Sequence, residues 1–155
     1  MKKTYLIIMM VSHALFSMAQ QDTIKKEVEW ENWNNGFPKS QQSQKIALID
    51  VYTDWCGWCK VMDKNTYTHP KVVETIDQYF VPIKFNPEKP EKYLVGTDTL
   101  DGRTLLGQLS GGKSSGYPTT YFFLPGTNQI FQQPGYIEPD QFILLLENVV
   151  SRSKK

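Results

Sequence analysis

The stretch that most restricts the fold is IALIDVYTDWCGWCK, residues 46–60, because it joins an apolar run to both cysteines of the chain. The run at residues 46–52 is nearly continuous and is bounded by polar residues, which is typical of a strand buried on both faces. Cys56-Gly-Trp-Cys59 follows at once, and residues 60–62 indicate a helix continuing from it. The cysteine spacing alone leaves three interpretations open: a redox pair, half of a metal site, or a structural disulfide.

The N-terminus predicts export. Lys2 and Lys3 precede a mostly apolar stretch at residues 5–16, and Ser17-Met18-Ala19 offers small residues where a signal peptidase cleaves. An apolar run of about a dozen residues is too short to span a bilayer. We therefore predict a signal peptide at residues 1–19 and a location in the periplasm or outside the cell. An uncleaved N-terminal anchor is the alternative.

Length and charge narrow the possibilities further. Cleavage after Ala19 leaves 136 residues, which predicts one domain at residues 20–155. A chain of this size forms a sizeable core without a stabilising disulfide. A disulfide between cysteines three residues apart also removes little entropy from the unfolded chain. A disulfide kept for stability alone is therefore the weak interpretation. Without residues 1–19 the chain has 15 basic and 16 acidic residues, and this net charge of −1 indicates no nucleic-acid partner.

Helices and strands alternate along the rest of the chain. The pattern predicts a helix starting at Thr68-His69-Pro70, a strand at residues 80–85 and a short helix around residues 105–109. A strand at residues 116–124, a returning strand at 130–133 and a helix at about 139–150 follow. Residues 21–45 show only isolated aromatic anchors, and residues 86–103 indicate mostly loop. This order predicts an α/β fold of three layers, with a central mixed sheet flanked by helices.

Several stretches resemble one known family. ALIDVYTDWCGWCK resembles the active-site strand and helix of thioredoxin-like proteins, and GYPTTYFF and QPGYIEPDQFILLLENVV continue the resemblance over about residues 44–150. YTDWCGWCK, THPKVVETI and YFVPIKF are similar to exported bacterial thioredoxin-like domains, including the thiol-reducing domains of periplasmic disulfide reductases. The resemblance implies a thioredoxin-like fold with its core at residues 44–150.

Thiol–disulfide chemistry assigns different roles to the two cysteines. Cys56 lies where the predicted helix begins, so unpaired N–H groups and the helix dipole stabilise its thiolate. We therefore predict that Cys56 is the exposed nucleophile and that Cys59, one turn further on, is deeper and resolves the mixed disulfide. The resemblance implies that Asp50 is a buried carboxylate that moves a proton to or from Cys59. The alternative is a strand-end Asp satisfied by hydrogen bonds.

Two lysines match further positions of the family. The resemblance implies that Lys84 faces Asp50 from the neighbouring strand and that Lys60 is the basic residue after the motif. The alternative for each lysine is a solvated charge, and for Lys60 we favour that interpretation.

The resemblance also implies a substrate surface. The proline that matches Pro118 is cis and lies against the CxxC motif, and the residue before it, here Tyr117, pairs with the substrate chain like an added strand. Many relatives carry a small or β-branched residue in place of Tyr117. We expect Trp55 and Trp58 to line the same surface, although exposed-looking aromatic residues can also belong to a core.

Two patterns suggest other chemistry. GQLSGGKS, from Gly107 to Ser114, fits a phosphate-binding loop letter for letter, but it follows a helical stretch instead of a strand, so we expect no nucleotide there. A closed zinc site needs four ligands, and the CxxC supplies two. His69 is marked as a helix cap by Pro70. We expect no metal or other cofactor besides the Cys56–Cys59 pair, and a metal shared between two chains is the alternative.

Together these features predict an exported thiol–disulfide oxidoreductase that reduces protein disulfides. Its expected partners are disulfide-containing proteins and a membrane thiol electron donor, and we expect a monomer. The alternatives are a non-catalytic binding module with a passive disulfide and a metal carrier for cytochrome oxidase assembly that uses the same pair.

Overall fold

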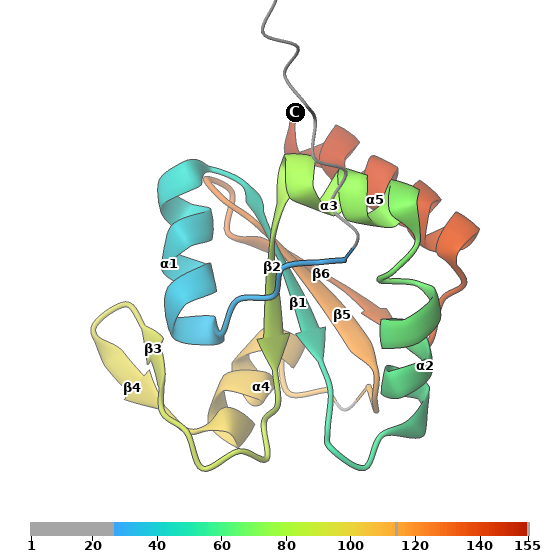
Figure 1. The fold of residues 1–155 in the computed structure, drawn as a ribbon. Coiled ribbons are helices and arrows are strands. Elements are labelled where there is room, and N and C mark those ends of the chain that lie inside the picture. Colours follow the sequence, from blue (N-terminus) through green and yellow to red (C-terminus); the bar gives the residue numbers. More distant parts are fainter. Residues whose placement is uncertain (1–26, 114, 155) are drawn as a thin grey trace, which may run out of the picture.

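A four-stranded sheet forms the centre of the molecule, and helices lie against both of its faces (Figure 1). The computed structural model describes residues 27–113 and 115–154, so the predicted signal peptide at residues 1–19 lies outside the described residues. In chain order the elements are α1 (Trp33–Ser43), β1 (Ile46–Val51), α2 (Gly57–Asn65), α3 (Pro70–Tyr79), β2 (Phe80–Phe85), β3 (Tyr93–Val95), β4 (Asp98–Leu100), α4 (Gly102–Ser110), β5 (Thr119–Leu124), β6 (Gln129–Pro134) and α5 (Pro139–Ser153).

The sheet is mixed, as predicted. Its strand order is β2-β1-β5-β6. β1 runs parallel to β2 and antiparallel to β5, which in turn pairs antiparallel with β6. All six residues of β1 are buried, because strands lie on both sides of it and helices cover both faces. The predicted α/β class with a central mixed sheet is confirmed.

Alternate residues of β1 pack into two separate hydrophobic cores, one on each face of the sheet. Leu48 packs with residues of α2, α3 and α5 on one face of the sheet, whereas Ile49 packs with residues of α1 and α4 on the other. Asp50 is two residues from Leu48, so it points to the same face as α2. The period of the strand thus places a carboxylate beneath the helix that carries the cysteines.

Two stretches that were predicted without regular structure contain elements. Residues 21–45 include α1, in which Trp33 stacks on Phe37 with ring centroids 4.7 Å apart. Residues 86–103 include the two-stranded hairpin β3–β4. The Trp33 indole N–H donates to the Leu94 carbonyl at 2.9 Å, so each element supports the other. The packed body therefore begins before residue 44, because Val28 and Trp33 are buried.

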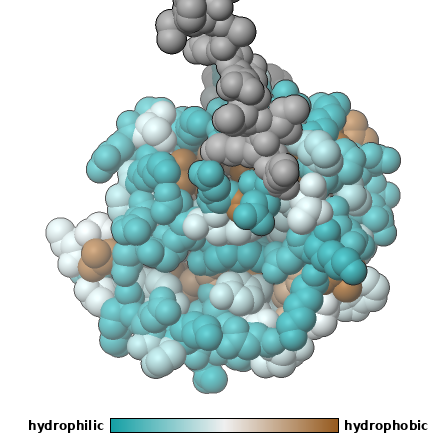
Figure 2. Space-filling model, in the orientation of Figure 1, coloured by the Kyte–Doolittle hydropathy of each residue, from teal (hydrophilic) through white to brown (hydrophobic). Residues whose placement is uncertain are grey.

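The other predicted elements are present, with small changes at their ends. α3 has Pro70 in its first turn, and α5 continues to Ser153, three residues beyond its expected end. The face of the molecule seen in Figure 1 is mostly hydrophilic, with scattered hydrophobic residues (Figure 2). Among the described residues, none of the helices combines the length and the apolar content that crossing a bilayer requires.

Candidate active site

The two cysteines form a disulfide at the start of α2. Cys56 is the N-cap residue, as predicted, and its Sγ accepts a hydrogen bond from the Cys59 N–H at 3.1 Å. The Cα atoms lie 5.4 Å apart. The expected difference in depth is not found, because Cys56 is 4% exposed and Cys59 3%. The S–S bond keeps the two sulfur atoms adjacent, so in this oxidised form the two cysteines are buried to nearly the same extent.

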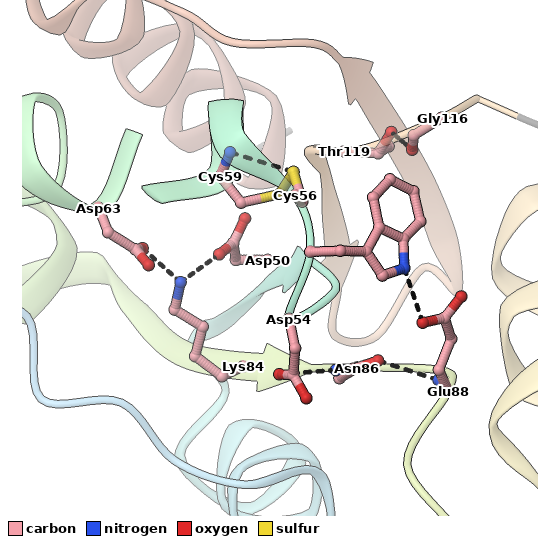
Figure 3. The surroundings of a disulfide bond; sticks show 11 residues. Asp50, Asp54, Cys56, Cys59, Asp63, Lys84, Asn86, Glu88, Gly116 and Thr119 are labelled. Atoms are coloured by element: carbon pink, nitrogen blue, oxygen red, sulfur yellow. Dashed lines mark hydrogen bonds and ion pairs between the residues drawn. A yellow bond between two sulfur atoms is a disulfide. The ribbon is translucent and has the colours of Figure 1, made fainter. Parts of the chain in front are cut away.

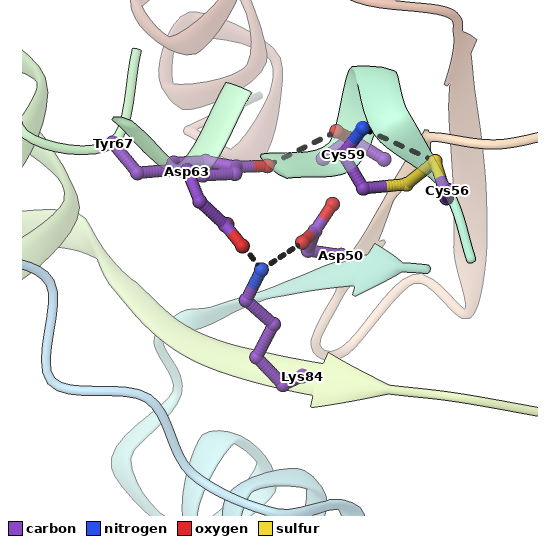
Figure 4. Close-up of polar contacts among 7 residues, drawn as sticks. Asp50, Cys56, Cys59, Asp63, Tyr67 and Lys84 are labelled. Atoms are coloured by element: carbon purple, nitrogen blue, oxygen red, sulfur yellow. Dashed lines mark hydrogen bonds and ion pairs between the residues drawn. A yellow bond between two sulfur atoms is a disulfide. The ribbon is translucent and has the colours of Figure 1, made fainter. Parts of the chain in front are cut away.

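Asp50 lies beneath this disulfide. Its carboxyl group is buried, and Oδ2 accepts a hydrogen bond from the Lys84 ammonium at 2.6 Å. Among the described residues no hydrogen-bond partner reaches Oδ1. Figure 4 shows this free oxygen pointing toward the disulfide. Burial raises the pKa of Asp50, and the opposing attraction of Lys84 does not cancel that effect. The group is therefore poised to hold a proton next to the cysteines.

Lys84 reaches Asp50 because the two residues are register partners on the parallel strands β1 and β2. Its Nζ also contacts Asp63, a carboxylate on α2 four residues after Cys59. The three charged groups form the row Asp50–Lys84–Asp63 drawn in Figure 4. Burial alone would lower the pKa of the Lys84 ammonium, but the two carboxylates outweigh it and the pKa is raised. Lys84 is thus a fixed positive charge.

Aromatic rings surround the ammonium of Lys84. Its Nζ lies 4.7 Å from the ring centroid of Trp30, 5.1 Å from that of Tyr52 and 5.5 Å from that of Tyr67. Burial raises the pKa of the Tyr67 hydroxyl well above its usual range, and the charge of Asp50 adds to this. Tyr67 is therefore a neutral neighbour of the charged row.

A polar network ties the loop before Cys56 to the loop after β2 (Figure 3). The Trp55 indole N–H donates to Glu88 Oε2 at 2.9 Å. Asn86 donates to Asp54 at 3.3 Å and accepts from the Glu88 backbone N–H at 2.9 Å. Lys89 donates to Asp54 at 2.8 Å, and this hydrogen bond holds the pKa of the Asp54 carboxyl below its usual range. The position of Trp55 is therefore set by a second loop.

Two pairs of aromatic rings lie beside the cysteines. Trp55 meets Tyr117 edge to face with ring centroids 5.7 Å apart, and Trp58 meets Tyr136 with centroids 5.4 Å apart. Trp55 is 67% and Trp58 61% exposed, so both are surface residues. The Tyr117–Pro118 peptide bond is cis. We call Trp55, Tyr117, Trp58 and Tyr136 the aromatic rim.

The remaining candidates take no part in this cluster. Lys60 is exposed on α2, outside the Asp50–Lys84–Asp63 row. Its charge adds to the effect of Lys89 in lowering the pKa of Asp54. The stretch that begins at Gly107 starts inside α4, which is the wrong order for a phosphate-binding loop. His69 is the N-cap residue of α3. Within residues 27–113 and 115–154 no group of three or more His, Cys, Asp or Glu side chains is arranged to hold a metal.

Sequence reasoning missed several residues of the site. Asp63 has a signal in the sequence, because a residue four positions after Cys59 lies on the same face of a helix. Trp30, Glu88 and Tyr136 have none, since each reaches the site from a segment outside the motif. Their place depends on tertiary contacts.

Fold and site together define a thioredoxin-like domain with a disulfide-bonded CxxC at the start of a helix. The family model Thioredox_DsbH, described as a protein of unknown function, DUF255, matches residues 17–151. The chain therefore belongs to this family.

Individual proteins support the same class. The thiol:disulfide interchange protein DsbD of Tatumella citrea is 30% identical over 112 residues, which is 71% of this chain and 17% of that protein. The chain thus spans less than a fifth of the length of this relative. A thioredoxin from Thermus thermophilus has a TM-score of 0.66 at 16% identity, over 82% of this chain and 90% of that one. The reduced DsbD C-terminal domain of Neisseria meningitidis has a TM-score of 0.52 at 23% identity, over 72% and 87%. These two structures show the fold, which confirms the thioredoxin-like prediction.

Proposed function

We propose that this chain is an exported thiol–disulfide oxidoreductase that reduces disulfides in proteins. The observation that carries the proposal is the Cys56–Cys59 pair at the N-terminus of α2, directly above the buried Asp50. A disulfide kept only for stability has no need of a buried carboxylate beside it, because burying that group opposes folding.

The reaction begins from the reduced pair. The Cys56 thiolate attacks one sulfur of a substrate disulfide, a mixed disulfide forms, and the other substrate sulfur leaves as a thiolate. Cys59 then loses its proton and attacks Cys56 Sγ, which releases the second substrate thiolate. Two electrons pass to the substrate, and the chain is left with the Cys56–Cys59 disulfide. The N-terminus of α2 favours the thiolate at Cys56 over one at Cys59.

Asp50 is suited to take the proton from Cys59. Burial raises its pKa above that of a free Asp, and a carboxylate with a higher pKa is a stronger base. Its Oδ1 lacks a hydrogen-bond partner among the described residues and points toward the disulfide (Figure 4). Lys84 holds the other oxygen, so the orientation of the carboxyl group is fixed.

The aromatic rim is the proposed substrate surface. In the part of the chain that the structure describes, no hydrogen bond occupies the backbone N–H or C=O of Tyr117, so both are open to an extended substrate segment. Trp55, Trp58 and Tyr136 would contact apolar side chains on either side of the substrate cysteine. We expect substrates whose disulfide lies in an extended segment.

The remaining parts of the proposal are the direction of electron transfer and the electron donor. The relative in Tatumella citrea is named a thiol:disulfide interchange protein, and the N-terminal sequence of this chain predicts export. Outside the cytosol a reductant must be kept reduced. We therefore propose that a membrane thiol protein supplies two electrons to the Cys56–Cys59 disulfide after each turnover.

Reduction of insulin by dithiothreitol tests the activity. We expect the chain to accelerate insulin precipitation and Cys56→Ser to abolish the acceleration. Cys59→Ser should accumulate the mixed disulfide, visible as an adduct by mass spectrometry. Trp33→Phe serves as the control for a general loss of fold, since Trp33 packs on the opposite face of the sheet. Equal rates with the wild-type chain and with Cys56→Ser would support a passive disulfide.

A further inference from the structure

A segment upstream of the sheet crosses the outer edge of β2 and pairs with it through the bridge between Glu31 and Ile83 (Figure 1). We call residues 28–33 the β2 strap. The Glu31 N–H donates to the Pro82 carbonyl at 2.9 Å, and the Glu31 carbonyl accepts from the Lys84 N–H at 3.0 Å. The strap thus holds the backbone of the residue whose ammonium contacts Asp50.

The strap also holds the other end of Lys84. The centroid of the Trp30 ring lies 4.7 Å from Lys84 Nζ, close enough for a cation–π interaction. Tyr67 packs edge to face against the same Trp30 ring at 4.8 Å and fixes its plane. One short segment therefore binds Lys84 through its main chain and through its charge.

The groups that face Lys84 come from several elements. Asp50 lies on β1, Asp63 on α2, Tyr52 follows β1 and Tyr67 follows α2. Three further charged residues line, with Lys84, the same pocket of about 250 Å³: Glu31, Lys89 and Glu91. Glu31 is paired with Lys39 and Lys89 with Asp54. Trp30 is an uncharged wall of this pocket, beside the ammonium that it contacts.

We propose that Trp30 is a positioning residue for the dithiol reaction: it keeps the Lys84 ammonium against Asp50. The inference deepens the proposed function and rests on it. Without the ring, the flexible lysine can move into the adjoining pocket, and water screens its charge. The positive contribution of Lys84 to the potential at the cysteines then weakens, and the carboxylates Asp50 and Asp63 are less well neutralised. Both changes disfavour the Cys56 thiolate.

Alkylation of Cys56 measures this effect without any substrate protein. We would reduce the full chain carrying Cys59→Ala and follow its reaction with iodoacetamide across pH by mass spectrometry. Trp30→Leu should raise the apparent pKa of Cys56 by roughly 0.3–0.5 units. Lys84→Met should raise it further. The double variant should match Lys84→Met alone, because Trp30 acts through the lysine.

Controls separate positioning from structural support. Phe37→Leu removes the ring stacked on Trp33 and lies outside the pocket of Lys84, so it should lower the melting temperature and leave the Cys56 pKa unchanged. Trp30→Phe keeps a ring and should give a smaller shift than Trp30→Leu; it replaces that variant if Trp30→Leu does not fold. A Trp30 shift below about 0.1 units, or full additivity with Lys84→Met, would overturn the proposal. Insulin reduction by the wild-type chain tests the underlying function separately.

Discussion

At the scale of single residues, Asp50 carries opposite consequences for activity and for stability. Its carboxyl group is buried next to the Cys56–Cys59 disulfide, and burial raises the pKa of this group. The native state therefore holds this proton more tightly than the unfolded chain does. Stability consequently falls as the pH rises through the raised pKa of Asp50, and the charged form above that pKa opposes folding.

Asp50→Asn tests both consequences. Resolution of the mixed disulfide at neutral pH should slow by about 10²-fold, because this variant lacks the proposed proton acceptor. The melting temperature should rise, since a buried amide opposes folding less than a buried carboxylate and Lys84 keeps Asp63 as a partner. The increase in melting temperature should be largest above the raised pKa of Asp50 and should become smaller as the pH falls through that pKa. Stopped-flow turnover and thermal scans from pH 4 to 9 measure the two effects, and unchanged turnover would leave Asp50 a purely structural role.

The predicted site residues came from two sources. The order of strand, CxxC and helix placed Cys56 at a helix start, whereas the resemblance to thioredoxin-like proteins implied that Asp50 is buried and faces Lys84. Glu88 and Tyr136 escape such reasoning, because their contacts with Trp55 and Trp58 join segments far apart in the sequence. The equal burial of the two cysteines also escaped it, since it depends on the closed disulfide.

At the scale of elements, long periodic segments were predictable and short or polar ones were not. β1 and α5 have strong apolar patterns and were predicted within a few residues of their ends. α1 contains Gly36 and Pro38 and is mostly polar, so intrinsic propensity argues against a helix there. The stacked Trp33 and Phe37 and the bond to Leu94 stabilise it instead. Such tertiary support leaves no periodic signal.

Two glycines of α4 provide a matched test of how tightly the elements pack. A Cβ at Gly102 would lie 2.4 Å from the Pro87 carbonyl oxygen, whereas a Cβ at Gly107 meets nothing within 4 Å. Gly102→Ala should destabilise the fold by about 2 kcal/mol, because a backbone group must move. Gly107→Ala should stabilise it by about 0.5–1 kcal/mol through helix propensity. Urea unfolding measures both changes in stability. Equal unfolding midpoints for the two variants would show that the loop at Pro87 moves aside without cost.

The same contact links packing to the site. Pro87 lies between Asn86 and Glu88, the residues that hold Asp54 and Trp55. Gly102→Ala should therefore also slow insulin reduction, whereas Gly107→Ala should not.

At the scale of the whole molecule, the question is which way electrons flow. Strong oxidants outside the cytosol have potentials near about −120 mV, because a very low nucleophile pKa stabilises their reduced form. A His within the CxxC often contributes to this, and here the two positions are Gly57 and Trp58. Asp54, two residues before Cys56, is a negative charge that would disfavour the thiolate, but Lys89 offsets that charge. The buried Asp50 remains the nearby acid that opposes a thiolate.

We therefore predict a potential of about −200 to −270 mV, which makes the chain a reductant. A glutathione titration followed by tryptophan fluorescence measures it, because Trp55 and Trp58 adjoin the disulfide in the sequence. Asp50→Asn should shift the potential upward, since a stabilised thiolate favours the reduced form. A wild-type value above about −150 mV would make the chain an oxidant.

The β2 strap has a consequence for how copies of the molecule behave when crowded. An uncovered edge strand is a template for aggregation between sheets. Glu31 already occupies hydrogen-bonding groups of Pro82 and Lys84 on the β2 edge. On the opposite edge, β6 ends at Pro134, which has no N–H to donate, and the Arg152 guanidinium lies over the Phe131 ring at 5.2 Å. Each edge of the sheet thus carries a feature that limits edge-to-edge association, which is useful if the proposed substrates are chains with exposed, extended segments.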